Sequence, residues 1–170
     1  MDVRRYDPEL QLPFLELIAR LVLSYREFTS ANDITEQLGG RRVTDIADAP
    51  EMRVLDSVTP LPEGFTQGVF QFWESRGRRG VFDFAFHGER LVNFRAQLLF
   101  VGLLGKLRAV LFYVSRLRPF MHRAFRGPGW CYDPLMDGFC ADTDDGLKVT
   151  FRRPAGEPYV SVCLTDQGYV

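Results

Sequence analysis

The chain has 170 residues and a formal net charge of −1, with 46% hydrophobic and 14% aromatic residues. This length suits one domain with a substantial core, and the apolar content excludes a disordered chain. Glycine and proline show no collagen-like period, and three cysteines are too few for a disulfide-dense scaffold. We therefore expect a single domain over residues 1–170.

The charge is distributed unevenly along the chain. Residues 1–62 carry 7 basic and 11 acidic side chains, residues 63–132 carry 11 and 4, and residues 133–170 carry 3 and 7. Arginine outnumbers lysine 19 to 2. A basic middle segment can bind an anionic partner, or it can pair with the acidic ends when the chain folds. Both interpretations stay open at this stage.

The first third of the chain predicts two helices. Apolar residues recur at helical spacing and predict a helix over 12–28. A second, shorter helix should follow, with Asn32 or Asp33 as its N-cap and Gly39-Gly40 as its end. Prolines interrupt the next segment, in which only residues 52–58 have the composition of a strand.

The middle of the chain predicts strands. Aromatic-rich runs at 69–73 and 81–86 flank a glycine-containing turn at 75–80, which is typical of a β-hairpin. A second turn is expected at 87–90. Residues 92–98 alternate between apolar and polar side chains and predict a half-buried strand.

An apolar run at 96–114 contains eleven Leu, Phe or Val residues and two charges, Lys106 and Arg108. The cost of inserting two central cations into a bilayer offsets the apolar gain, so we expect a buried core segment rather than a membrane span. The second half of the run has helical spacing, and this helix should end at Pro119. Residues 119–135 should be irregular.

The C-terminal part predicts a meander of three strands, near 136–141, 147–151 and 160–164, with turns at 144–146 and 154–158. Together with the earlier elements, this pattern defines an α+β fold. N-terminal helices and one internal helix should pack on a mostly antiparallel β-sheet.

No motif predicts a cofactor or a metal. The glycines form neither of the common phosphate-binding loops. The acidic cluster at 142–146 lacks the alternating ligands and the final Glu of a calcium loop. Structural zinc sites usually present closely spaced ligand pairs. The available residues are not spaced in this way: His122, Cys131, Cys140 and Cys163.

A thiol nucleophile is the one enzymatic alternative. Cys131 or Cys140 would need His122 as a base, with Asp133 or Asp137 to orient the imidazole. This combination would make the protein a small hydrolase or transferase. Because no local motif supports it, we expect a protein without catalytic activity.

The basic tract predicts a binding function. Arginine beside exposed rings is typical of protein interfaces and of single-stranded nucleic acid sites. We expect an arginine-rich, non-enzymatic binding module of the inhibitor, immunity or accessory type, which occludes an acidic surface on a protein partner. The expected binding residues combine arginines with two tryptophans: Trp73, Arg76, Arg78, Arg79, Arg123 and Trp130.

Other partners stay open for this tract. Nucleic acid binding would use the same residues and would weaken steeply with salt. Peripheral membrane contact would use residues 98–114. The first residues contain no apolar stretch typical of a signal peptide, so we expect a cytoplasmic protein without a transmembrane span.

Overall fold

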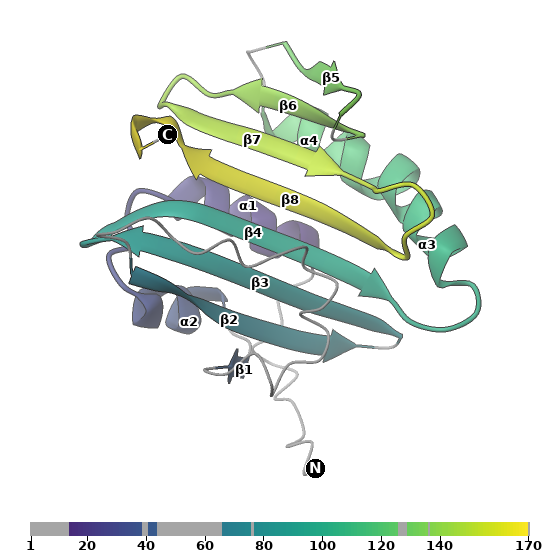
Figure 1. Cartoon of the computed structure of the whole chain (residues 1–170), viewed down its shortest axis with the longest axis horizontal. Coiled ribbons are helices and arrows are strands. Elements are labelled where there is room, and N and C mark those ends of the chain that lie inside the picture. The colour runs from purple at the N-terminus through teal and green to yellow at the C-terminus, as the bar shows by residue number, and fades with distance from the viewer. Residues whose placement is uncertain are drawn as a thin grey trace.

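The computed structural model describes residues 14–38, 41–43, 66–75, 77–125, 129–135 and 137–169. The strand expected at 52–58 and the helix end expected at Gly39-Gly40 lie outside these residues. The described residues form one antiparallel sheet with helices on one face, so the predicted α+β fold is confirmed. Figure 1 shows the helices behind the sheet. Buried side chains of the helices and of the sheet form the core between them.

The sheet has the strand order β1-β2-β3-β4-β8-β7-β6-β5, and each neighbouring pair is antiparallel. The strands are β1 (Arg41–Val43), β2 (Thr66–Ser75), β3 (Arg78–His87), β4 (Arg90–Phe100), β5 (Cys131–Asp133), β6 (Gly138–Asp142), β7 (Leu147–Arg152) and β8 (Tyr159–Asp166). The helices are α1 (Phe14–Ser24), α2 (Ala31–Leu38), α3 (Gly105–Phe112), the π-helix η4 (Tyr113–Leu117), α4 (Arg118–Ala124) and the 3₁₀ helix η5 (Gln167–Tyr169).

Both predicted turns between β2, β3 and β4 are confirmed, but the first is tighter than expected. Ser75 pairs with Arg78, so Arg78 and Arg79 belong to β3 rather than to a six-residue turn. Gly77 has a φ of 73°, which suits glycine because it lacks a Cβ. The second turn joins His87 to Arg90.

The aromatic side chains of β3 and β4 face the helices. Phe82 and Phe94 are fully buried, and their ring centroids lie 5.4 Å apart. Alternation along each strand places every second side chain on this face. These strands therefore supply core rather than exposed rings, and the other phenylalanines on the same face are Phe84, Phe86 and Phe100.

The N-terminal helices follow the prediction except at one cap. Helix α1 covers the middle of the expected 12–28 segment and buries its apolar side. The N-cap of α2 is Ser30, not Asn32 or Asp33: the Asp33 N–H donates to Ser30 Oγ at 3.3 Å. The Asp33 carboxylate accepts hydrogen bonds from the Thr29 and Ser30 N–H groups, both at 2.9 Å. Asp33 therefore closes a reciprocal capping box.

The internal helix continues past Pro119, so the predicted end there is wrong. A π-turn precedes the proline, and the Arg118 N–H donates to the Tyr113 carbonyl five residues earlier. An α-helical register would press the proline ring against a backbone carbonyl. The wider π-turn avoids this clash. Residues up to Ala124 are helical rather than irregular, and a short strand, β5, follows.

Candidate docking surface

Helix α3 packs against the sheet through its smallest residues. Gly105 and Ala109 are buried. A methyl group added at Gly105 would lie only 2.2 Å from the Phe100 carbonyl oxygen at the end of β4. This close approach brings the helix backbone to the sheet, and the larger side chains of α3 are left on other sides.

The leucines of this helix project away from the core. Leu103 is fully exposed, and four further residues have exposed fractions of 54–58%. We call these five residues the leucine stripe: Leu103, Leu104, Leu107, Leu111 and Val114. The expectation of a buried core segment at 96–114 is therefore wrong for the five residues of the leucine stripe. The apolar spacing correctly predicted a helix, but Gly105 and Ala109 form the buried face of α3.

Cations surround the leucine stripe. Lys106 and Arg108 are exposed and lie about 100° to either side of Leu107 around the helix. The sequence from Arg90 to Tyr132 contains no Asp or Glu. The surface is therefore apolar along its centre and positive on its flanks. The helical segment contains five cations, Lys106, Arg108, Arg116, Arg118 and Arg123. Of these, Arg118 lies over the Phe139 ring of β6, 4.9 Å from its centroid.

The β2–β3 turn lies beside the start of α3. The Val101 N–H donates to the Gly77 carbonyl at 2.8 Å. The Arg78 guanidinium lies over the rings of Phe100 and Phe112, at 5.5 and 5.6 Å from their centroids. Arg78, one of the expected binding residues, therefore adds a positive charge near the leucine stripe.

The other expected arginines are more dispersed. Arg79 is half-buried in β3, whereas Arg123 is exposed on α4, where its Nε donates to the Pro119 carbonyl at 3.2 Å. Arg76 lies outside the described residues. Arg78 therefore lies beside α3 and Arg123 lies in the last turn of α4, so the described arginines do not form one cluster.

The two expected tryptophans are not placed together. The backbone of Trp73 lies in β2, next to one edge strand of the sheet, whereas Trp130 directly precedes β5 at the other edge. Trp130 is half-buried and packs edge-on against Phe151, with ring centroids 5.0 Å apart. Its indole N–H is buried and has no hydrogen-bond partner among the described residues. Trp130 thus contributes mainly to packing.

The structure does not bring His122 to the cysteines. The His122 ring contacts Trp130, Phe139 and Phe151 on the helix side of the sheet. Cys140 follows Phe139 in β6, so it points to the opposite face. Desolvation, and secondarily the nearby Arg118 charge, lower the pKa of His122 below its ordinary value. The hydrolase alternative therefore has no Cys–His contact to support it.

The three cysteines occupy one row across the outer face of the sheet. Cys131 pairs with Cys140, Cys140 with Thr150, and Thr150 with Cys163. All three thiols are free, and Cys131 is exposed. Sequence spacing concealed this arrangement because the strands between these residues fold back on one another. Among the described residues, no group of three His, Cys, Asp or Glu side chains could hold a metal ion.

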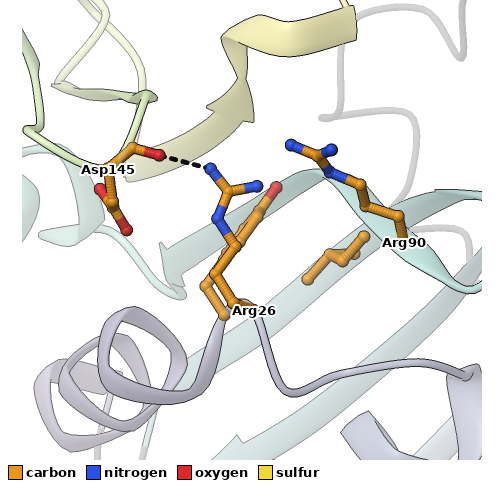
Figure 2. A pocket seen from close by; sticks show the side chains of 5 residues that line it. Arg26, Arg90 and Asp145 are labelled. Atoms are coloured by element: carbon orange, nitrogen blue, oxygen red, sulfur yellow. Dashed lines mark hydrogen bonds between the residues drawn. The ribbon is translucent and has the colours of Figure 1, made fainter.

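A second candidate site lies at the end of α1. A cavity of about 340 Å³ is lined by Tyr25, Arg26, Arg90, Leu91 and Asp145. Figure 2 shows Arg26 and Arg90 reaching toward this opening from the end of α1 and the start of β4. Burial raises the pKa of the Tyr25 hydroxyl far above its ordinary value, and the Asp166 charge adds to this effect.

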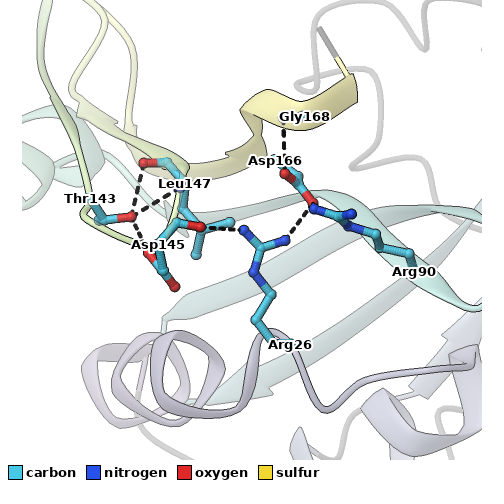
Figure 3. A network of polar contacts seen from close by, with 7 residues as sticks. All are labelled: Arg26, Arg90, Thr143, Asp145, Leu147, Asp166 and Gly168. Carbon is cyan, nitrogen blue, oxygen red and sulfur yellow. Dashed lines mark hydrogen bonds and ion pairs between the residues drawn. The ribbon is translucent and has the colours of Figure 1, made fainter.

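Both arginines of this cavity bind one buried carboxylate. Asp166 accepts from Arg26 Nη1 at 2.5 Å, from Arg90 Nε at 2.6 Å and from the Gly168 N–H at 3.1 Å (Figure 3). Arg26 also donates to the Asp145 carbonyl at 2.6 Å. Burial alone would raise the pKa of Asp166, but these hydrogen bonds outweigh it and hold the pKa below its ordinary value.

The polar contacts of this network lie within the fold. The two guanidinium groups share the Asp166 carboxylate, and Arg26 also donates to the Asp145 backbone carbonyl, so both arginines already have partners. Its contacts join α1, β4, the β6–β7 turn and the end of β8. The network therefore serves to hold α1 against the sheet, and the leucine stripe is the stronger functional candidate.

Comparison with protein families, curated proteins and solved structures finds no match to this chain. Within the described ranges, no helix is long and apolar enough to cross a membrane.

Proposed function

We propose that this protein is a non-enzymatic binding module that docks on an anionic surface of a larger partner through the leucine stripe and its flanking cations. One observation supports the proposal: five large apolar side chains are exposed on α3 and on the residues at its two ends, while the small residues of α3 are buried. Contiguous exposed apolar surface on a folded chain usually marks an interaction site.

The energetics favour the leucines as the main contribution to such docking. Complete burial of one leucine side chain contributes about 1.5–3 kcal/mol, whereas an exposed ion pair contributes about 0–1 kcal/mol. The cations would therefore select and orient an anionic partner, and the leucines would supply most of the affinity. Nucleic acid binding has less support, because the described rings of β3 and β4 are buried and cannot stack on bases.

A paired-variant capture experiment tests the proposal. The stripe variant Leu104→Ser/Leu111→Ser removes two exposed leucines, one at the N-cap of α3 and one within the helix. The matched control Leu23→Ser/Leu135→Ser removes two leucines that are also exposed, on α1 and in the β5–β6 turn. Immobilised wild type and both variants are exposed to cell extract, including its membrane fraction, and the captured material is quantified.

We expect a captured component whose yield falls at least tenfold with the stripe variant and is unchanged with the control. Circular dichroism must show that both variants fold like the wild type. Equal capture by the two variants would refute docking through this surface. The sequence also led us to expect that the module blocks the partner it binds. This is tested by measuring whether wild-type protein inhibits the activity of the captured component.

A further inference from the structure

We infer that the partner of the leucine stripe is the surface of an anionic lipid bilayer, on which α3 rests without crossing it. This inference depends on the proposed docking function and narrows its partner to one chemical class. It is favoured over an acidic protein by the shape of the stripe, by the placement of its cations and by the anchoring of the helix.

The shape of the stripe suits a deformable partner. Leu103 projects fully from the turn before α3, and Leu107 and Leu111 project from the helix side that faces away from Ala109. A protein partner would need a groove to match this ridge. A bilayer interface accepts projecting apolar side chains at any spacing, because the lipids rearrange around them.

The cations lie where lipid headgroups would be when the leucines enter the acyl region. Lys106 and Arg108 flank the stripe along α3, and Arg116 continues the exposed positive charge into η4. Their aliphatic stems can follow the apolar surface while their charges reach phosphate oxygens. Each cation near an anionic membrane strengthens binding by about fivefold. With no acidic residue between Arg90 and Tyr132, no charge in this segment opposes that attraction.

The helical segment is fixed to its own domain. Ala109, Leu117 and Met121 are fully buried in the core. The segment therefore cannot leave the sheet to insert lengthwise, and no described helix is long and apolar enough to span a bilayer. Figure 1 places α3 at one end of the sheet, beyond the last residues of β4, where it can meet a flat surface.

Vesicle flotation with the full chain tests this inference. The vesicles contain phosphatidylcholine alone or phosphatidylcholine with phosphatidylserine. We expect wild type to float only with the phosphatidylserine vesicles, and less in high salt. Leu103→Ser/Leu107→Ser and Lys106→Glu/Arg116→Glu should each lower the bound fraction at least tenfold, whereas Leu23→Ser/Leu135→Ser should not change it.

Two outcomes would overturn the membrane inference. One is the absence of wild-type binding to the phosphatidylserine vesicles. The other is equal binding by the stripe variant and the leucine control. If the vesicles do not bind but a protein is captured by the wild type and lost with Leu104→Ser/Leu111→Ser, the partner is a protein and the docking function still holds. If neither the vesicles nor any captured component distinguishes the stripe variants from the control, both proposals fail.

Discussion

The substitution Asp166→Asn tests whether the buried carboxylate holds α1 to the sheet. The Asp166 side chain is 1% exposed and receives two arginine contacts at 2.5 and 2.6 Å. Removing one charge from a buried pair costs about 3–5 kcal/mol. Here Arg26 and Arg90 are 35% and 48% exposed, so water compensates part of the loss. We expect a decrease of about 2 kcal/mol in the free energy of unfolding, or about 4–8 °C in Tm.

The stabilisation by Asp166 should depend on pH, because only the ionised carboxylate attracts the two arginines. Because the folded pKa of Asp166 lies below its ordinary value, the ionised carboxylate stabilises the fold above the unfolded pKa, near 3.9. That stability is lost as the pH falls through the folded pKa. Urea unfolding followed by circular dichroism should therefore show wild type and Asp166→Asn separated at pH 7 and converging in acid.

The control for Asp166 is an exposed ion pair. Glu16→Gln removes the contact between Glu16 and Arg20, whose side chains are about half exposed, and should change stability by less than about 0.5 kcal/mol. Equal stability of Asp166→Asn and wild type at pH 7 would refute the reasoning. A stability difference that stays constant into acid would also refute it, because it would not arise from the carboxylate charge.

Two further substitutions test the geometry around the sheet. Gly105→Ala should lower the free energy of unfolding by about 1–3 kcal/mol, because the added methyl group meets a β4 carbonyl oxygen, and this cost exceeds the gain from the helix propensity of alanine. The control Lys106→Ala, at an exposed position of the same helix, should have little effect on stability. A Gly105→Ala protein more stable than wild type would contradict the close packing. Cys131 and Cys140 face each other across antiparallel strands, where Cα atoms lie about 4.5–5.5 Å apart, a separation that a disulfide can bridge. Hydrogen peroxide should oxidise the two thiols to one disulfide and release two waters. The intact mass should then fall by two hydrogens in wild type but not in Cys140→Ser. Disulfides between two molecules, in place of the intramolecular one, would contradict the pairing of Cys131 with Cys140.

The pairing of strands that are neighbours in sequence was predictable, because the turns that join them have recognisable sequences. Turns at His87–Arg90 and Asp144–Gly146 join strands adjacent in sequence, and the period-two alternation set which face of each strand is buried. The pairing of β4 with β8, whose segments lie far apart in sequence, had no comparable local signal. This pairing joins the two halves of the sheet, and it is what brings Arg90 to Asp166.

The candidate surface was harder to predict for a different reason. Counting apolar residues correctly identifies a helix with one strong side, but it does not say which side meets the core. In α3 the decisive residues are Gly105 and Ala109, which carry almost no hydrophobic signal yet permit the closest approach to β4. Attention to the small residues, rather than the leucines, would have indicated the buried side.

The π-turn explains how the cations and the leucines come to share one segment. An α-helix ended at Pro119 would place the following residues in a loop and separate Arg123 from α3. The Arg118 to Tyr113 hydrogen bond lets the helix pass the proline, and Leu117 and Met121 then anchor the continuation in the core. The leucine stripe therefore stands on a rigid helical segment. Because this segment is already ordered, docking would not require it to fold first, which lowers the entropy cost of binding.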